Sequence, residues 1–219
     1  MRVAIDGPAG AGKSTIARLC AKKLGFIYID TGAMYRAAAV YAIEHGIKID
    51  ALNMTEDVLD NIKIDIAYEN GNQRIYLCGK DVSERIREAD ASVGASNIAV
   101  IPAVRLKLVE LQRKLAEGND VIMDGRDIGT YVLPDAEVKI FLTASVEERA
   151  RRRYAEMLEK GMSADFEKVK QDIEYRDKND SEREFAPLRQ ADDAILIDSS
   201  DMSADDVVLR MIELIKGAE

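Results

Sequence analysis

The sequence contains very little histidine, tryptophan or cysteine. In 219 residues it has one histidine, no tryptophan and two cysteines. The single histidine, His45, ends a helical pattern just before Gly46, where a surface or cap residue is expected, so we predict no histidine-based acid–base or nucleophilic catalysis. Cys20 and Cys78 are far apart and match no metal-binding or redox spacing. Cys20 lies on the apolar stripe of a predicted helix, which indicates a core residue.

Long apolar runs and an excess of positive charge are also missing. No apolar run approaches the length of a membrane span, and the chain enters a predicted strand at once, leaving no room for a signal peptide. We therefore expect a cytoplasmic protein with no membrane partner. The formal net charge of −9 argues against general nucleic-acid binding. On such a background, a phosphate-binding protein must gather its positive charge in one cleft, and the arginines are indeed clustered at 149–153 and 176–189.

Residues 7–15 form a glycine-rich segment between a predicted strand at 2–6 and a predicted helix that stops at Gly25. The segment fits the pattern G-x-x-x-x-G-K-[ST] of phosphate-binding loops. Its glycines let backbone N–H groups turn toward phosphate oxygens, and the helix adds its positive N-terminal end. Lys13 can reach the β- and γ-phosphates, and the Ser14 hydroxyl can bind Mg²⁺. The predicted ATP-binding residues of this loop are Gly7, Pro8, Ala9, Gly10, Ala11, Gly12, Lys13, Ser14 and Thr15.

The order of the predicted elements indicates an α/β fold. Strand, phosphate loop, helix and strand form a βαβ unit, which is typical of a parallel sheet. Further buried strands are predicted at 26–29, 121–124, 138–142 and 194–198, giving five parallel strands flanked by helices. Helices are predicted at 83–92, 102–118, 145–161 and 165–180, with Arg105 outside the inward-facing stripe of the second.

Two segments interrupt this alternation. Apolar residues alternate with polar or small ones at 64–68 and 75–77, and the intervening Asn70-Gly71 is a strong hairpin signal. An antiparallel hairpin inside a parallel α/β chain indicates an inserted subdomain, which we place at about 50–97. The second interruption, at about 145–185, holds the arginine cluster. We thus predict a single domain over 1–219 with two excursions.

Four arginines suggest a second anionic site that faces the phosphate loop. They fall at element ends, or in helices, beside the sheet edge where open α/β folds bind ligands. Arginine presents a planar fork that binds phosphate oxygens in pairs. Hydrolysis of a triphosphate needs a positioned water, whereas transfer needs such a second anionic site. The pattern therefore favours phosphoryl transfer, and the residues concerned are Arg36, Arg126, Arg176 and Arg183.

Five stretches together resemble the bacterial cytidylate kinases. They are the loop at 7–15, Asp-Thr-Gly-Ala-Met-Tyr-Arg at 30–36, the region 96–113, Asp-Gly-Arg-Asp-Ile-Gly-Thr at 124–130, and Arg-Asp-Lys-Asn-Asp-Ser-Glu-Arg at 176–183. The resemblance covers essentially the whole chain, including the insertion that distinguishes this group from other nucleoside monophosphate (NMP) kinases. It implies a P-loop NTPase fold with an NMP-binding insertion and a helical lid. It also implies transfer of the γ-phosphoryl group of ATP to CMP or dCMP, with Mg²⁺.

The resemblance further implies roles at matching positions. The catalytic set would be Lys13, Arg126, Arg176 and Arg183. Arg36, Arg126 and Arg183 would hold the acceptor phosphate, and Arg176 the transferred group. Ser96, Arg105 and Asp127 would contact the cytosine edge, and Asp180 the ribose. Thr31, where the family often has serine, and Tyr35 belong to the same substrate site. Among the arginines at 149–153, which resemble a lid, Arg152 would contact ATP, and Asp124 would organise Mg²⁺ through water.

Other P-loop functions remain open at this point. One alternative is a kinase that acts on UMP, AMP or shikimate, and another is a nucleotide-dependent switch. The hairpin insertion and the turn at 125–127 favour a cytidylate kinase over other kinases. The chain also has no guanine-reading Asn-Lys-x-Asp stretch, which disfavours a GTP switch. We expect a monomer whose partners are ATP and CMP or dCMP, and no nucleic acid.

Overall fold

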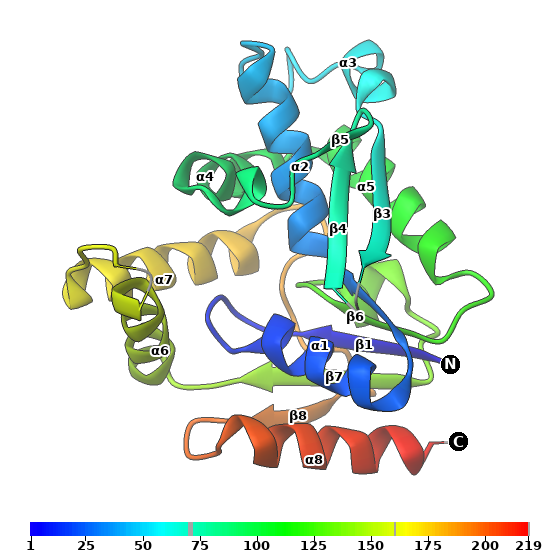
Figure 1. Ribbon diagram of the computed structural model, residues 1–219, viewed down its shortest axis with the longest axis vertical. Coiled ribbons are helices and arrows are strands. Elements are labelled where there is room, and N and C mark those ends of the chain that lie inside the picture. Colours follow the sequence, from blue (N-terminus) through cyan, green and yellow to red (C-terminus); the bar gives the residue numbers. More distant parts are fainter. Residues whose placement is uncertain (70–71, 160, 219) are drawn as a thin grey trace. The chain divides into compact units, whose positions relative to one another are not determined.

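The computed structural model describes residues 1–69, 72–159 and 161–218. They form two compact units, named here unit 1 (Met1–Tyr28 with Asn119–Glu219) and unit 2 (Ile29–Gly118). The predicted Asn70-Gly71 turn lies outside the described residues. Figure 1 labels most of the helices and strands of the two units.

A five-stranded sheet has the strand order β2-β6-β1-β7-β8 (Figure 1). Strand β1 pairs in parallel with β6 and with β7, and β7 pairs in parallel with β8. The inner strands β1 and β6 are almost wholly buried, which explains their continuous apolar runs. The predicted five-stranded parallel sheet is confirmed. Its strands are β1 (Arg2–Asp6), β2 (Ile27–Asp30), β6 (Val121–Asp124), β7 (Val138–Thr143) and β8 (Ile195–Asp198).

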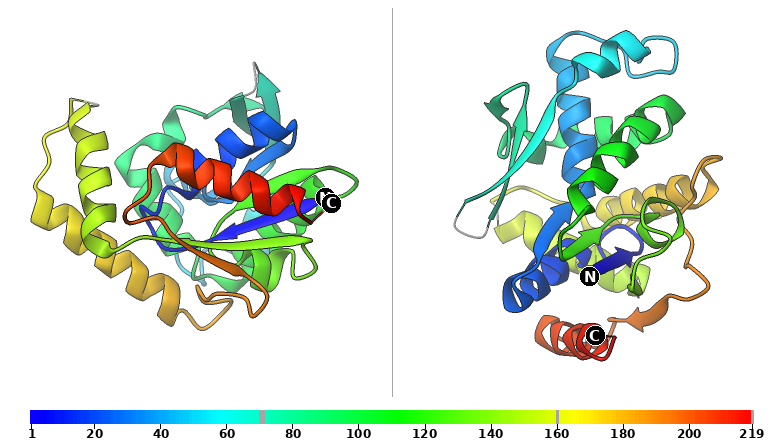
Figure 2. Two further views of the ribbon diagram at one scale, coloured as in Figure 1. Left: turned by 90° about the horizontal axis from the view of Figure 1, so that it is seen from below. Right: turned by 90° about the vertical axis from the view of Figure 1, so that its right-hand side faces the viewer.

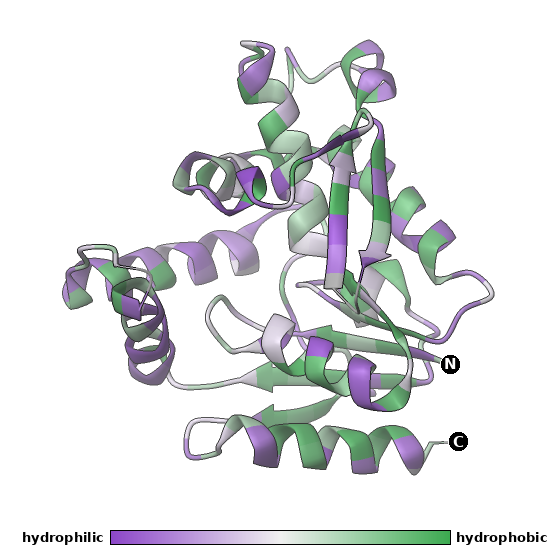
Figure 3. Ribbon diagram, viewed as in Figure 1, coloured by the Kyte–Doolittle hydropathy of each residue, from purple (hydrophilic) through white to green (hydrophobic). Residues whose placement is uncertain are grey.

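Helices α1 (Lys13–Leu24) and α8 (Ala204–Lys216) pack together in unit 1. Ile16 and Cys20 of α1 and Met211 of α8 share a buried apolar cluster with residues of β1 and β7, so the predicted core position of Cys20 is confirmed. In Figure 3 the ribbon of α8 alternates between hydrophobic and hydrophilic segments, as expected for a helix with one buried face. Helix α1 ends at Gly25, whose φ of 74° suits glycine.

Helices α6 (Val146–Glu159) and α7 (Phe166–Glu182) form a pair with a small core of its own. Val169 and Ile173 are buried in this core, and the rings of Tyr154 and Phe166 meet edge to face at 5.9 Å. The Ser145 hydroxyl accepts a hydrogen bond from the Glu148 N–H at 3.2 Å, in agreement with the predicted helix start. Both helices lie inside the interval 145–185, and Figure 2 shows them from two further directions.

Unit 2 contains a three-stranded antiparallel sheet of order β3-β4-β5. Ile64 faces Leu77 and Ile66 faces Ile75, so the alternating apolar residues share one face of the pair. The predicted antiparallel strands are therefore confirmed. The strands are β3 (Ile64–Glu69), β4 (Asn72–Leu77) and β5 (Lys80–Asp81). The helices of this unit are α2 (Thr31–Glu44), α3 (Glu56–Asn61), the 3₁₀ turn η1 (Arg85–Arg87), α4 (Ala89–Ile98) and α5 (Pro102–Ala116).

The region predicted as one helix at 83–92 differs in the structure. It is divided into η1 and α4 by Glu88, whose φ of −69° and ψ of 158° are extended rather than helical. Helix α4 approaches α2 closely at Gly94, where a Cβ would lie 2.9 Å from the Cβ of Ala39. Because α2 packs against α4 and α5, the compact unit around the antiparallel sheet extends beyond 50–97 on both sides.

Within the described parts of the chain, we find no single helix that is long and apolar enough to cross a membrane. Helices α4 and α5 satisfy the length and composition criteria only when they are joined. They are bent by 103° at the break between them.

Candidate active site

The phosphate loop joins the end of β1 to the start of α1. A Cβ on Gly7 would lie 1.9 Å from the backbone oxygen of Leu142 in β7, so a larger residue would collide with the sheet. Gly10 and Gly12 have φ values of 76° and 85°, a region that favours glycine. Gly12 is the N-cap of α1 and has no side chain to occupy the first N–H groups of the helix. These N–H groups and the helix dipole form an anion-binding site.

Lys13 is buried at the start of α1, and its ammonium group donates a hydrogen bond to the backbone oxygen of Pro8 at 2.7 Å. Burial lowers the pKa of Lys13 to about 7, and the positive charge of Arg126 lowers it as well. The charges that act in the opposite direction are those of Asp124, Asp180 and Asp6. A phosphate group near Lys13 would restore its full charge.

Ser14 and Asp124 bring their side-chain oxygens together beside the loop. The Ser14 hydroxyl donates to one carboxylate oxygen of Asp124 at 2.9 Å, and the Tyr28 hydroxyl donates to the other at 2.8 Å. Asp124 ends β6 and is 4% exposed. Mg²⁺ prefers oxygen ligands, keeps several waters and is bound in P-loop proteins by a serine hydroxyl and a carboxylate at a strand end. The residues present therefore fit Mg²⁺, with Tyr28 orienting the carboxylate.

Asp6, at the end of β1, holds the turn that follows β6. Its two carboxylate oxygens accept hydrogen bonds from the N–H groups of Ile128 at 2.8 Å and Gly129 at 2.7 Å. These residues open a π-helical turn, η2 (Ile128–Val132), that sequence analysis did not predict. Burial raises the pKa of Asp6 to about 6, while the two N–H groups act to lower it. Asp6 thus fixes the segment directly after Arg126 and Asp127.

Arg126, Asp127, Asp180 and Arg183 are brought together in unit 1 as ion pairs. Arg126 pairs with Asp180 at 2.7 Å, and Arg183 pairs with Asp127 at 3.3 Å. Arg183 also donates to the backbone oxygen of Ala186 at 2.7 Å. The side chains of Asp127 and Arg183 are 7% and 5% exposed, whereas Arg126 and Asp180 are about one-quarter exposed, at 28% and 24%. The Arg126–Asp180 pair is therefore the more open of the two to an incoming anion.

Arg176, in α7, differs from these paired arginines. Within the described chain, its guanidinium has no hydrogen bond or ion pair to a carboxylate. Burial lowers the pKa of Arg176, and the positive charge of Arg153 lowers it further. An arginine that is destabilised by burial and by other cations is a favourable binding point for an anion.

Arg152 makes several contacts within the protein. It donates to the hydroxyl and the backbone oxygen of Ser199, at 3.1 and 2.7 Å, and to Glu148 at 3.0 Å. These bonds connect α6 to the residue that follows β8. A contact of Arg152 with ATP stays a prediction.

In unit 2, the start of α2 carries three of the predicted substrate residues. Asp30 caps the helix by accepting a hydrogen bond from the Ala33 N–H at 2.8 Å, and it also pairs with Arg36 at 3.1 Å. Thr31 and Tyr35 lie on the same helix and are largely buried.

Arg105 and Ser96 are the other two substrate residues predicted in this unit. Arg105 is 1% exposed, so its predicted place outside the inward-facing stripe of α5 is wrong. It donates to the backbone oxygen of Ala99 at 3.1 Å, and its guanidinium lies over the Tyr35 ring at 5.5 Å from the centroid. These contacts explain how an arginine is accommodated on a buried face. Ser96 lies exposed on α4.

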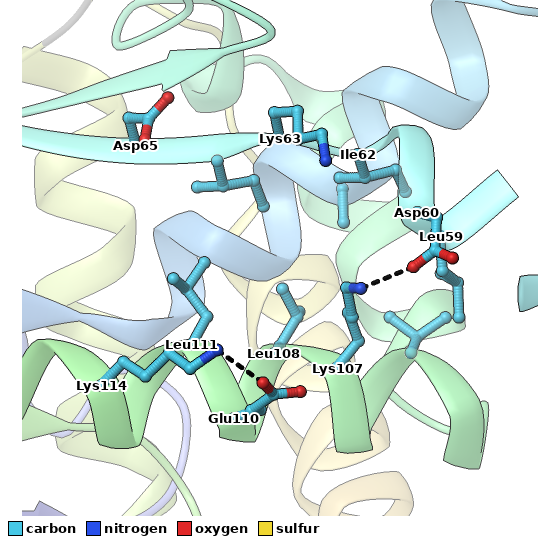
Figure 4. A pocket seen from close by; sticks show the side chains of 13 residues that line it. Leu59, Asp60, Ile62, Lys63, Asp65, Lys107, Leu108, Glu110, Leu111 and Lys114 are labelled. Atoms are coloured by element: carbon cyan, nitrogen blue, oxygen red, sulfur yellow. Dashed lines mark hydrogen bonds and ion pairs between the residues drawn. The ribbon is translucent and has the colours of Figure 1, made fainter. Parts of the chain in front are cut away.

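A cavity of about 350 Å³ lies elsewhere in unit 2, between α5 and the segment formed by α3 and β3 (Figure 4). Its lining includes Leu59, Ile62 and Leu108, with Lys107 and Lys63 at its edge. Lys107 is paired with Asp60 at 2.7 Å. None of the residues predicted to bind substrate or ATP lines this cavity.

Sequence analysis missed Tyr28 and Asp6 as supporting residues of the site. Tyr28 lies in β2 and donates a hydrogen bond to Asp124 of the neighbouring strand β6, so no sequence spacing links the two. The sequence could have identified Asp6 as a site residue, because a carboxylate at the end of a buried strand lies at the ligand-binding edge of a parallel sheet.

The parallel sheet, the phosphate loop after β1, the Ser14–Asp124 pair and the arginines of unit 1 define a P-loop kinase. The sequence model of the family described as "Cytidylate kinase" matches residues 3–217. A cytidylate kinase of Caldicellulosiruptor saccharolyticus is 53% identical over 214 residues, which cover 98% of this chain and 95% of the relative. One of Lactobacillus johnsonii is 50% identical over 216 residues, with 99% and 94% covered. The chain belongs to the cytidylate kinase family.

A comparison of folds gives a consistent result. A solved structure of an uncharacterized protein from Eubacterium ventriosum matches with a TM-score of 0.53 and 15% sequence identity. The match covers 99% of this chain and 98% of that one. At this level of identity the likeness concerns the fold alone.

Proposed function

We propose that this protein transfers the γ-phosphoryl group of ATP to CMP or dCMP, giving ADP and CDP or dCDP. Membership of the cytidylate kinase family supports this activity. The single structural observation that carries it is the gathering of cations around the phosphate loop.

Arg126 is close enough to affect both Lys13 and Arg176. The charge of Arg126 lowers the pKa of both Lys13 and Arg176, although the three residues come from α1, the turn after β6, and α7. Like charges gathered in a partly buried place are unfavourable unless an anion binds there. Two phosphate groups, one from the donor and one from the acceptor, would satisfy them. A switch that binds a single triphosphate needs no such surplus.

On the donor side, the N–H groups of the loop and the ammonium group of Lys13 would hold the β- and γ-phosphates. Ser14 would bind Mg²⁺ directly and Asp124 through water. When bound, this ion neutralises charge on the phosphate oxygens. Arg176 would contact the transferred group as its charge redistributes.

On the acceptor side, Arg126 and Arg183 in unit 1, and Arg36 in unit 2, would each bind the phosphate of the monophosphate. That phosphate is already an anionic nucleophile, so no general base is required. Arg126 would exchange its ion pair with Asp180 for the phosphate, which frees Asp180 to accept a hydrogen bond from the ribose. The exchange is favoured because Arg126 can bind phosphate oxygens with paired N–H groups.

The cytosine base would be recognised by complementary polar groups. Its exocyclic amine is a donor, and N3 and O2 are acceptors. Asp127 would accept from the amine, Arg105 would donate to the ring, and Ser96 would add a hydroxyl. Thr31 and Tyr35 would complete the substrate contacts in unit 2.

Several coarser features belong to the same proposal. We infer a single kinase domain over 1–219, with an NMP-binding insertion at about 50–97 and a lid at about 145–185. We further propose a monomeric cytoplasmic enzyme that uses Mg²⁺ and binds neither nucleic acid nor membrane. The net charge of −9 supports the exclusion of nucleic acid. The mass of the protein in solution tests the oligomeric state.

The proposal is tested by measuring ADP release from ATP with a panel of acceptors. We expect turnover with CMP and dCMP to exceed that with UMP, AMP and shikimate. Higher turnover with AMP or UMP than with CMP would overturn the cytosine assignment. Hydrolysis that does not depend on any acceptor would instead indicate a nucleotide-dependent switch.

A further inference from the structure

The two peptide groups that flank Ala9 in the phosphate loop are bound by side chains from α6 and α7. The Ala9 backbone oxygen accepts a hydrogen bond from Arg149 at 2.8 Å. The Ala9 N–H donates to one carboxylate oxygen of Asp177 at 3.3 Å. The other oxygen of Asp177 pairs with the same terminal nitrogen of Arg149 at 2.7 Å. The two side chains thus bind each other and the loop.

Lys13 binds to one of these two peptide groups of the loop. The peptide group between Pro8 and Ala9 carries two of the contacts, because its oxygen accepts from Lys13 and its N–H donates to Asp177. The conformation of this peptide therefore determines where the amine of Lys13 is held. Within the loop itself, the Ala11 N–H adds a long hydrogen bond of 3.5 Å to the Pro8 oxygen, while Gly7 and Gly10 on either side restrict the backbone least.

Burial and hydrogen bonding hold the Arg149 side chain in one position. Its side chain is 5% exposed, and its Nε donates to the backbone oxygen of Ala144 at 2.9 Å. A Cβ on Gly10 would lie 3.2 Å from the Cβ of Arg149 and 3.6 Å from Ile173, so the loop lies directly against both helices. A buried guanidinium needs a counter-charge, and Asp177 supplies it.

We propose that Arg149 and Asp177 are positioning residues that set the phosphate loop for ATP through the peptide groups of Ala9. This inference rests on the proposed kinase function, because it concerns the donor site of that reaction. It differs from the role expected for the arginines at 149–153, since Arg149 acts on the loop and not on the nucleotide.

Arg149 and Asp177 lie toward opposite ends of the α6–α7 segment. Arg149 lies in the first turn of α6, and Asp177 lies in the last third of α7, so the pair attaches the base of both helices to the loop.

The test is the equilibrium binding of a non-hydrolysable ATP analogue with Mg²⁺, and separately of CMP, to Arg149→Met, Asp177→Ala and the double variant. Removing a charge-assisted contact should weaken binding of the analogue at least about tenfold. CMP binding should change less than about twofold. Because the two residues act as one unit, the double variant should lose no more than the worse single variant. Arg149→Lys, which keeps the charge, should recover part of the loss.

A matched control is available on the same two helices. Lys170 of α7 pairs with Glu147 of α6 at 3.1 Å, but this partly exposed pair does not touch the loop. Lys170→Met should leave binding of the analogue unchanged. Equal losses in analogue and CMP binding would overturn the proposal, because they indicate a merely structural role, and so would unchanged analogue binding. Failure of the proposed function has a different signature, since CMP would not be phosphorylated by the unaltered protein.

Discussion

Lys13 allows a quantitative prediction about protons taken up on nucleotide binding. Its pKa in the free protein is lowered to about 7, chiefly by burial. A triphosphate placed against the ammonium group supplies the missing opposite charge, so the pKa should return to about its ordinary value near 10. Binding should therefore draw a proton from solution whenever the free lysine is partly neutral.

The magnitude follows from the two pKa values. A group with a pKa of about 7 is roughly one-tenth protonated near pH 8, about half protonated near pH 7 and roughly nine-tenths protonated near pH 6. Uptake should thus be about 0.9 proton near pH 8, falling to about 0.1 near pH 6. Charging the lysine costs about 1.4 kcal/mol for each pH unit above its pKa, so affinity should fall about tenfold per unit.

The measurement is titration calorimetry with the Mg²⁺ complex of a non-hydrolysable ATP analogue. Buffers of different ionisation enthalpy separate the heat of proton transfer from that of binding. Near pH 8 the phosphates of the Mg²⁺ complex are already fully ionised, because a phosphate monoester loses its second proton near pH 6 and bound Mg²⁺ further favours the ionised form. The proton signal at that pH then comes from the protein.

Lys13→Arg is the matched control, since arginine stays charged at every pH used and should bind with almost no uptake. Uptake below about 0.2 proton near pH 8 in the unaltered protein would refute the argument. Equal uptake in Lys13→Arg would also refute it, because another group would then be the source.

Three further predictions concern other residues of the site. Asp127→Ala should reduce kcat/KM for CMP while ATP affinity stays within about twofold. Asp127→Asn should keep an acceptor for Arg183. Equal losses for both substrates would show that Asp127 does not recognise the base. Arg36→Ala should cost at least about 2 kcal/mol in kcat/KM for CMP, the expected loss of a charge-assisted contact, and a change within about twofold would exclude Arg36 from the acceptor site. The pKa of Asp6 is raised from 3.8 to about 6, so the folded state binds this proton more tightly than the unfolded state does. Asp6 therefore contributes stability below about pH 4, and this contribution is lost as the pH rises through about 6. Relative to Asp6→Asn, the unaltered protein should therefore gain about 2.4 kcal/mol in unfolding free energy between about pH 7.5 and pH 4, and denaturant titrations showing no such change would contradict the shift.

The sequence by itself determined the phosphate loop and the class of the sheet. Gly7 has to be glycine because a Cβ there would collide with the backbone of Leu142. The motif identifies this position even though it does not reveal Leu142 as the neighbour. The strands at β1 and β6 were predictable because a strand buried on both faces has to be apolar throughout. Both features can be read from the sequence because each requires a particular residue type at a fixed position.

The side chains that support the site were decided only by the tertiary structure. Arg105 was expected outside the buried stripe of α5, but contacts with Ala99 and the Tyr35 ring let a charged residue face inward. The helix predicted at 83–92 is interrupted at Glu88, whose backbone is extended although the sequence pattern is continuously helical. Tyr35 is distant from Arg105 in sequence, so this contact leaves no periodic trace in the sequence of α5.

The contacts of the phosphate loop show the same division. Its motif predicted which residues bind phosphate, because the chemistry needs glycine, lysine and serine at fixed spacing. It did not indicate that Ala9 would be held by Arg149 and Asp177, which lie 140 and 168 residues away along the chain. Those contacts form only when α6 and α7 fold back onto the loop, since a buried arginine takes whichever oxygens the packed helices bring within reach.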